Sequence, residues 1–194
     1  MNEEHLQKRR HCEQCQRPLS VCLCLYLKQL HSPLQLIIWQ DPTEARHPLS
    51  TAPLLHKSIA GSRLVVADTL QPQDILPSDD LTTTALLYPF THKPPLTDTA
   101  RGDIKQLLIL DGTWRKVRRL LHLNPWLNDL PHIALNPAEP SRYAIRSSRQ
   151  RGGLSTIEAG VVALEWLDPA NDYEPLLQVL NKMVEIQQGF GHKG

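Results

Sequence analysis

Residues 106–123, QLLILDGTWRKVRRLLHL, constrain the fold more than any other stretch of the chain. Residues 107–110 form an unbroken apolar run, which is typical of a strand buried on both faces of a parallel sheet. Turn-forming residues interrupt this run from Asp111, and apolar residues then recur at helical spacing from Trp114. Ligands of open α/β sheets bind beyond the carboxyl ends of the strands. The sequence therefore predicts that Asp111 lies where the chain does its chemistry.

The rest of the chain alternates between strand and helix patterns. Apolar runs predict further strands at residues 34–39, 63–68, 83–88 and 132–135. Helical spacing predicts helices at residues 49–60, at 155–167 and after a capping Asp172. Residues 69–81, 90–103 and 135–155 show no period and are predicted to be loops. This alternation predicts an α/β fold, with a mostly parallel sheet and flanking helices.

All four cysteines lie in one short pattern, Cys12-x2-Cys15-x6-Cys22-x-Cys24. Two closely spaced thiolate pairs joined by a loop suit a tetrahedral zinc ion. Two disulfides are the alternative, which a cytoplasmic location would disfavour. Because protein would fill all four positions, the zinc is expected to be structural. We expect an N-terminal zinc-binding segment over residues 1–31, followed by an α/β domain over residues 32–194.

Charge and composition limit the possible partners. The sequence lacks an N-terminal secretion signal and any run of eighteen apolar residues, so we expect a cytoplasmic protein that does not bind membranes. The net charge is only +1, so affinity for a polyanion must come from local clusters. Two clusters qualify, within residues 115–119 and 142–151, although each alone is equally consistent with a solvated surface.

Several common catalytic motifs are missing from the sequence. No dinucleotide-binding glycine motif, phosphate-binding P-loop or serine-nucleophile elbow occurs. From the residues alone, the chain has one carboxylate at a strand end, local arginines and a candidate zinc site. This supports a site that handles a polyanion, and it does not specify a reaction.

Asp111-Gly112-Thr113-Trp114 resembles the Asp-x-Thr-Trp signature of the DTW-domain family, the tRNA-uridine aminocarboxypropyltransferases. One position departs from the family's pattern: Ser50 stands where the family often has asparagine, just before Thr51. Matches to other family motifs follow in the family's order along nearly the whole chain: the four cysteines, His47-Pro48 with Thr51, Tyr88-Pro89, Ser141-x-Tyr143-x-x-Arg146 and Thr156-x-Glu158-Ala159.

The resemblance implies a fold and a reaction. The fold would be SPOUT-like, with a C-terminal trefoil knot that binds S-adenosylmethionine, a topology that general rules of chain connection would exclude. The reaction would move the 3-amino-3-carboxypropyl group of S-adenosylmethionine to N3 of a tRNA uridine and release methylthioadenosine. The alternatives are a SPOUT-class RNA methyltransferase and a non-catalytic, zinc-containing RNA-binding protein. Whether the protein acts as a monomer or a homodimer stays open.

The resemblance also implies residue roles. Asp111 is the expected catalytic residue, either as the base that takes the uracil imide proton or as the group that holds the ammonium of the donor. A third possibility is that Asp111 caps the following helix. Arg146 is expected to grip the methionyl carboxylate.

The remaining expected contacts fall into two sets. Ser155 and Glu158 also fit a helix capping box, and Trp114 fits either a base-stacking or a core-packing role. The expected cofactor-binding residues are Tyr88, Pro89, Thr113, Leu135, Ser141, Tyr143, Arg146, Ser155, Thr156 and Glu158. The expected RNA-binding residues are His47, Thr51, Trp114, Arg115, Arg118, Arg119, Arg142, Arg149 and Arg151.

Overall fold

The computed structural model describes residues 10–76, 80–135 and 153–190. Its centre is a five-stranded sheet in the order β2-β1-β4-β3-β5, and every strand pair is parallel. The predicted α/β fold with a parallel sheet is confirmed. The strands are β1 (Gln35–Gln40), β2 (Arg63–Val66), β3 (Thr84–Leu87), β4 (Gln106–Asp111) and β5 (His132–Ile133).

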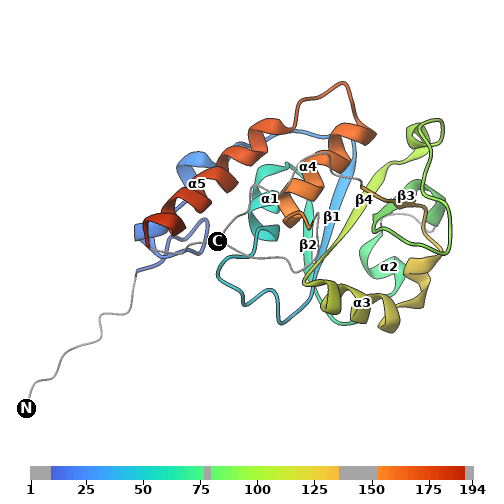
Figure 1. Cartoon of the computed structure of the whole chain (residues 1–194), viewed down its shortest axis with the longest axis horizontal. Helices are drawn as coiled ribbons and strands as arrows, with labels where there is room; N and C mark the ends of the chain where they lie inside the picture. The colour runs from blue at the N-terminus through green and yellow to red at the C-terminus, as the bar shows by residue number, and fades with distance from the viewer. Residues whose placement is uncertain (1–9, 77–79, 136–152, 191–194) are drawn as a thin grey trace, which may run out of the picture.

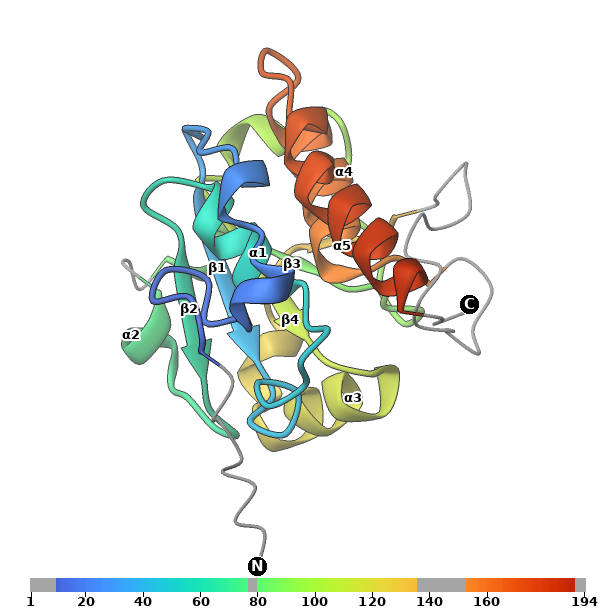
Figure 2. The same ribbon diagram turned by 90° about the vertical axis from the view of Figure 1, so that its left-hand side faces the viewer.

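Helices cover both faces of this sheet, so the molecule has three layers (Figure 1). One face carries α1 (Ala52–Ser58), α4 (Thr156–Leu167) and α5 (Leu177–Gly189). The other carries α2 (Pro72–Ile75) and α3 (Trp114–Leu123). Figure 2 shows α4 and α5 running side by side on their face of the sheet. Short 3-10 helices are η1 (Leu19–Val21), η2 (Cys24–Tyr26), η3 (Leu81–Thr83), η4 (Arg101–Asp103), η5 (Pro125–Asn128) and η6 (Glu174–Leu176).

The central strand β4 divides its side chains between the two layers. Leu107 and Ile109 pack in the cluster with α1, α4 and α5, whereas Leu108 and Leu110 pack in the cluster with α2 and α3. Side chains alternate between the faces of a strand. Asp111 therefore points toward the α1 and α4 side of the sheet, opposite to the basic helix α3.

Helix α4 lies unusually close to the sheet. A Cβ atom on Gly160 would come within 2.5 Å of Leu55 Cδ2 and 3.3 Å of Ile109 Cδ1. Only a residue without a side chain fits between α1 and β4 at this position. The close packing places the first turn of α4, with Ser155 and Thr156, beside the end of β4.

Several element boundaries differ from the sequence-based prediction. α1 begins at Ala52 rather than near residue 49, and β2 ends at Val66 rather than at residue 68. The segment predicted as loop over residues 69–81 contains the one-turn helix α2, where Asp74 accepts from the Gln71 backbone N–H at 2.8 Å. A single turn is too short to produce a helical period.

Asp172 caps a shorter element than expected. Its carboxylate accepts from the Glu174 backbone N–H at 3.0 Å, which starts η6, and α5 begins only at Leu177. In the described part of the chain, no helix is long and apolar enough to cross a membrane. The segment expected to form the knot falls largely in residues 136–152, outside the described residues.

Candidate active site and metal centre

The candidate active site begins where β1 and β4 end. Gln40 and Asp111 are register partners at the carboxyl ends of these two neighbouring strands. Their side chains are 2% and 4% exposed, so both polar groups are buried. Buried polar groups need hydrogen-bond partners, and these two supply partners to each other.

Both carboxylate oxygens of Asp111 accept hydrogen bonds. The Thr156 hydroxyl at the start of α4 donates to Oδ1, and Gln40 Nε2 donates to Oδ2 at 2.7 Å. Donors from β1 and α4 thus fix the plane of the carboxylate. A carboxylate held in this way can take a proton from a substrate or hold a cationic group. Two expected site residues, Asp111 and Thr156, are therefore in direct contact.

The cap of α3 is Thr113 rather than Asp111. The Thr113 hydroxyl accepts from the Lys116 backbone N–H at 3.4 Å, and Thr113 has the extended backbone of an N-cap residue. Asp111 instead belongs to β4, and its side chain bonds to residues of other elements.

Ser155 and Glu158 form the capping box that their spacing predicts. Glu158 is 5% exposed and accepts from the Ser155 backbone N–H at 2.8 Å and from its hydroxyl at 2.6 Å. This arrangement fixes the first turn of α4. A cofactor-binding role for either residue stays a prediction.

Two buried carboxylates that the sequence analysis did not select lie just after β1. Asp41 Oδ2 accepts from Arg119 at 2.8 Å, and Glu44 Oε2 accepts from Lys116 Nζ at 3.0 Å. Burial raises the pKa of Asp41, but hydrogen bonds from Thr43 and Arg119 outweigh it and lower the pKa to about 2. These ion pairs tie the β1–α1 loop, residues 41–51, to α3. Asp41 comes directly after β1, much as Asp111 ends β4. This position at a strand end is the sequence signal that could have selected Asp41.

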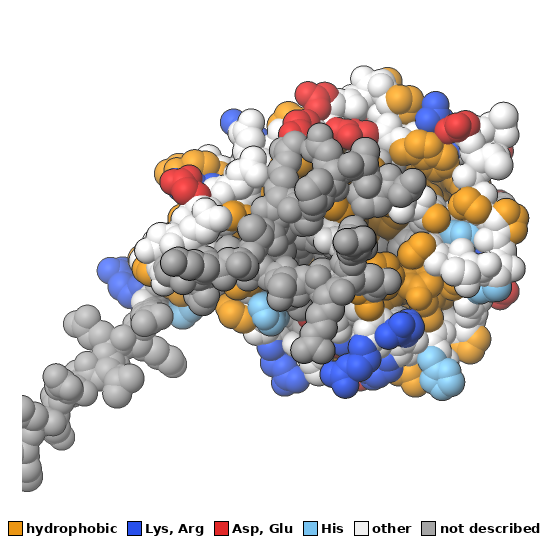
Figure 3. Space-filling view, viewed as in Figure 1, with side chains coloured by type: hydrophobic (Ala, Val, Ile, Leu, Met, Phe, Trp, Pro, Cys, Tyr) orange, Lys and Arg blue, Asp and Glu red, His pale blue; other side chains and the backbone are white. Residues whose placement is uncertain are grey.

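The cations of α3 differ in what they contact. Arg115, Arg118 and Arg119 are exposed, but Arg119 donates to both Asp41 and Asp68. Figure 3 shows Lys and Arg side chains gathered at the edge of the molecule where Figure 1 draws α3. This surface can attract phosphate through Arg115 and Arg118, while Lys116 and Arg119 already hold carboxylates.

Trp114 belongs to an aromatic cluster on the α3 side of the sheet edge. Its ring centroid lies 6.1 Å from that of Tyr88, which in turn lies 4.8 Å from that of Phe90. Trp114 is only half-buried, so packing and a contact with a base are both compatible with its position. Pro89, which follows Tyr88, is exposed to solvent, and Leu135, two residues after β5, is half-buried against the main core.

The other expected RNA contacts lie in the β1–α1 loop. His47 is half-buried, and its Nδ1 accepts from the Leu49 backbone N–H at 3.2 Å. Thr51 is only 4% exposed and precedes α1, which does not favour direct contact with RNA. Six expected residues lie outside the described residues: Ser141, Arg142, Tyr143, Arg146, Arg149 and Arg151.

His132 in β5 is a buried polar residue that sequence reasoning missed. It is 1% exposed, and neither ring nitrogen has a hydrogen-bond partner among the residues that the structure describes. Burial lowers the pKa of His132, and the nearby cation Lys93 lowers it further. The ring is therefore neutral near pH 7 and packs edge-on against Phe90, with centroids 5.2 Å apart.

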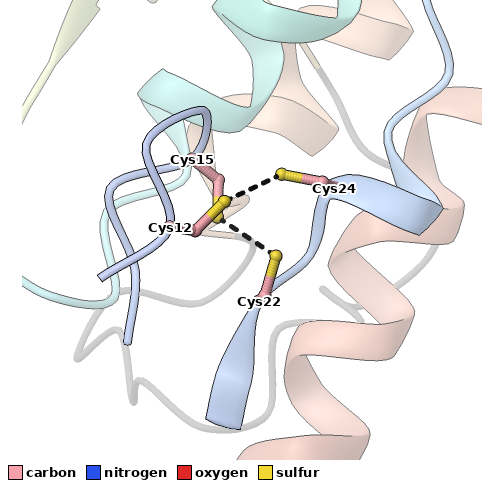
Figure 4. A group of neighbouring side chains, drawn as sticks. All are labelled: Cys12, Cys15, Cys22 and Cys24. Carbon is pink, nitrogen blue, oxygen red and sulfur yellow. Dashed lines mark hydrogen bonds between the residues drawn. The ribbon is translucent and has the colours of Figure 1, made fainter. Parts of the chain in front are cut away.

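The four cysteines converge on one point near the N-terminus (Figure 4). All four Sγ atoms lie within 4.8 Å of one another, with Cys12 and Cys24 at 3.5 Å and Cys15 and Cys22 at 3.8 Å. None of them forms a disulfide. Sulfur ligands of a tetrahedral zinc ion lie about 3.8 Å apart, because each Zn–S bond is about 2.3 Å long. The cluster thus has the size and the ligand type of a zinc site.

The thiols of the cluster differ in proton affinity: burial and the neighbouring thiols raise the pKa of Cys24 to about 12, whereas the pKa of Cys12 is lowered. Backbone hydrogen bonds from Cys15 and Gln14 lower the pKa of the Cys12 thiol to about 6. The thiolate is the form of cysteine that binds metal, so these N–H groups favour the ligand state.

The cysteine segment packs against the rest of the chain. Leu23, between Cys22 and Cys24, is fully buried in the main core with residues of α1, α4 and α5. Arg17 donates to the Pro48 carbonyl at 3.1 Å and lies 2.8 Å from Met183 Sδ. The candidate metal centre is therefore joined both to the core and to the β1–α1 loop.

Comparisons with known proteins identify relatives along nearly the whole length. A model of the DTW domain matches residues 9–188. The chain is 31% identical to tRNA-uridine aminocarboxypropyltransferase 2 of Drosophila melanogaster, over 93% of this chain and 76% of that protein. It is 29% identical to the mouse protein of the same name, over 97% of this chain and 67% of that protein. It is 25% identical to tRNA-uridine aminocarboxypropyltransferase A of Arabidopsis thaliana, over 94% and 83%.

No solved structure matches the chain significantly. The domain match and the Drosophila relative agree with the DTW motif at the end of β4. On these grounds, the chain belongs to the DTW-domain family.

Proposed function

We propose that this protein transfers the 3-amino-3-carboxypropyl group of S-adenosylmethionine to N3 of a uridine in tRNA. The relatives named as tRNA-uridine aminocarboxypropyltransferases support this activity. The observation that carries the proposal is the placement of Asp111, which ends the central strand with both carboxylate oxygens held by Gln40 and Thr156. The DTW signature thus lies at the edge of the sheet where α/β proteins bind their ligands.

The reaction breaks one carbon–sulfur bond and forms one carbon–nitrogen bond. The γ-carbon of the methionyl arm leaves the sulfonium sulfur for uracil N3, the bonding electrons return to sulfur, and the N3 proton is released. The products are modified tRNA, methylthioadenosine and a proton. Three carbons of the sulfonium are activated, so the protein selects the product by pointing the γ-carbon at N3.

Asp111 has two possible tasks in this reaction. As a base, it accepts the N3 proton while the new bond forms. As an anchor, it holds the ammonium group and thereby directs the arm that is transferred. The contacts from Gln40 and Thr156 serve either task, because both require one carboxylate oxygen at a defined place.

The finer parts of the proposal concern the donor site and the zinc ion. The donor would lie among the segments that follow β3, β4 and β5, in a SPOUT-like knot, with Arg146 on the methionyl carboxylate. Tyr88 and Leu135, which follow β3 and β5 at the same edge as Asp111, support this location. The four cysteines would hold a structural Zn²⁺ ion.

Product analysis tests the function directly. Purified protein is incubated with unmodified tRNA and S-adenosylmethionine, and nucleosides and small molecules are identified by mass spectrometry. We expect aminocarboxypropyl-uridine and methylthioadenosine in equal amounts. Formation of S-adenosylhomocysteine and a methylated base would instead identify a methyltransferase. Binding of tRNA without any product would identify a non-catalytic RNA-binding protein.

The exposed face of α3 is the proposed contact for the tRNA backbone. Arg118→Gln is expected to weaken tRNA binding and to reduce the slope of log K against log salt by roughly 0.7–0.9, because one phosphate contact is lost. Binding is measured by fluorescence anisotropy at several salt concentrations. Lys105→Gln is the control, since Lys105 is exposed at the opposite edge of the sheet, before β4. Equal effects of the two substitutions would contradict the proposal that the exposed face of α3 contacts the tRNA backbone.

A further inference from the structure

The carboxylate of Asp111 has a neighbour to which the family resemblance gives no role. Gln40 Nε2 lies 2.7 Å from Asp111 Oδ2 and 2.8 Å from Ser50 Oγ. The opposite orientation of the amide would place its oxygen against a carboxylate oxygen, so chemistry requires the N–H groups to face Asp111. Both hydrogens of the amide are then directed at oxygen acceptors.

We infer that Gln40 is a positioning residue that fixes the orientation and the proton affinity of the Asp111 carboxylate. The inference rests on the proposed function and adds a residue to its site. Gln40 acts through Asp111 and not on the reacting atoms. Gln40 is only 2% exposed, so its amide does not serve solubility. A buried amide costs free energy unless its hydrogen bonds offset the loss of water.

The β1–α1 loop, which supplies the second partner of Gln40, is held in place by further contacts. Ser50, which accepts from Gln40, is 6% exposed, and its backbone N–H donates to the His47 carbonyl at 3.0 Å. The β1–α1 loop that contains Ser50 is tied to α3 through Asp41 and Glu44. Arg17 ties the same loop to the cysteine segment through the Pro48 carbonyl. The loop is thus fastened on two further sides, and Gln40 has a fixed partner opposite Asp111.

The geometry predicts what the loss of Gln40 would do. Thr156 would still hold Oδ1, but Oδ2 would lose the Gln40 N–H, which contributes to fixing the rotation of the carboxylate about its bond to Cβ. A base or a cation-holding group that turns away from its target reduces the rate of reaction. Binding of the tRNA backbone takes place at other residues and should be unaffected.

Two substitutions test the inference. Gln40→Met keeps the length of the side chain and removes the donor, and it should lower kcat roughly 10- to 100-fold with an unchanged KM for tRNA. Gln40→Glu keeps the shape and places a second carboxyl group against Asp111, so that the two groups share a proton. In this variant the acid limb of the profile of kcat/KM against pH should move to higher pH.

A second measurement does not depend on activity. The carboxyl carbon of Asp111 is followed by ¹³C NMR and assigned by its absence in Asp111→Asn. Both Gln40 variants should raise the pH at which this carbon titrates. Gln35→Met and Gln35→Glu are matched controls, because Gln35 begins the same strand and donates to the Gly61 carbonyl at 2.7 Å, away from Asp111. Thermal unfolding of all four variants shows whether each of them is folded.

The outcomes separate the inference from the proposed function. An unchanged titration of Asp111 in folded Gln40 variants would overturn the inference, even if the wild type is an active transferase. A changed titration in a protein that transfers nothing would support the contact and refute the function. An effect of the Gln35 variants as large as that of the Gln40 variants would also overturn the inference.

Discussion

Asp111→Asn is expected to lower kcat/KM for aminocarboxypropyl transfer by roughly 10²- to 10⁴-fold, the range for loss of a general base. The substitution keeps the size of the side chain and removes its negative charge. Both tasks proposed for Asp111 need that charge, because a neutral amide cannot take up the uracil proton and holds an ammonium group much less strongly than a carboxylate does. The rate is measured with saturating tRNA and with tRNA below its KM, so that kcat and KM are obtained separately.

Binding measurements on the same variant distinguish the two tasks. If Asp111 is the anchor, Asp111→Asn weakens the binding of S-adenosylmethionine. The binding of methylthioadenosine is unchanged, because this product lacks the ammonium group. If Asp111 is the base, both ligands bind as they do to the wild type and only the chemical step slows. Isothermal titration calorimetry gives both dissociation constants without turnover.

The fold should survive this substitution. The introduced amide has the shape of the carboxylate, and a flip of the Gln40 amide would present its oxygen to the new N–H group, with the Ser50 hydroxyl turning to donate. Asp98→Asn is the control, because Asp98 is an exposed carboxylate whose Oδ1 accepts from Trp166 and which lies outside the site. Full activity of Asp111→Asn would refute any catalytic role for this residue.

The strand, turn and helix around Asp111 were predictable because their signals are local. Residues 107–110 are apolar and fully or nearly buried in β4, and α3 begins at Trp114, where the helical period begins. Ser155 caps α4, as its spacing from Glu158 indicated. Whether a residue lies at the end of a strand also depends on the nearby sequence. The sequence around Asp111 is therefore sufficient to predict its place at the edge of the sheet.

Local signals could not predict the contacts of Asp111, because its neighbours come from distant parts of the chain. The family resemblance assigned Thr156 to the same site, but nothing in the sequence analysis selected Gln40. Gln40 and Thr156 lie far from Asp111 in the sequence, and only the register of β1 with β4 and the close packing at Gly160 bring them together. The pairing of Arg119 with Asp41 and Asp68 has the same origin. A run of cations in a sequence shows where charge is, and the folded structure decides how much of it remains for a ligand.

The second large effect concerns the cysteine cluster, for which we expect one zinc ion per chain in metal analysis. Cys24→Ser should lower the zinc content and destabilise the whole protein. Leu23 is fully buried in the main core between two of the cysteines, so a disordered cluster would release it. Loss of a buried leucine costs about 2–5 kcal/mol, which corresponds to several degrees in Tm for a chain of this size. Thermal unfolding in reducing buffer measures this loss.

The contacts of the cysteine segment explain why the effect should extend beyond it. Arg17 fastens the β1–α1 loop through Pro48, and the same loop supplies Ser50 to Gln40, so loss of the metal should also loosen the support of Asp111. A chelator should accordingly reduce kcat at temperatures where circular dichroism still shows a folded sheet. Ser20→Ala, an exposed change between the cysteine pairs, is the control for the variant. A zinc content near zero in active, reduced protein would show that the cysteine cluster does not need a metal ion. An unchanged Tm in Cys24→Ser would show that Leu23 stays buried without an intact cluster.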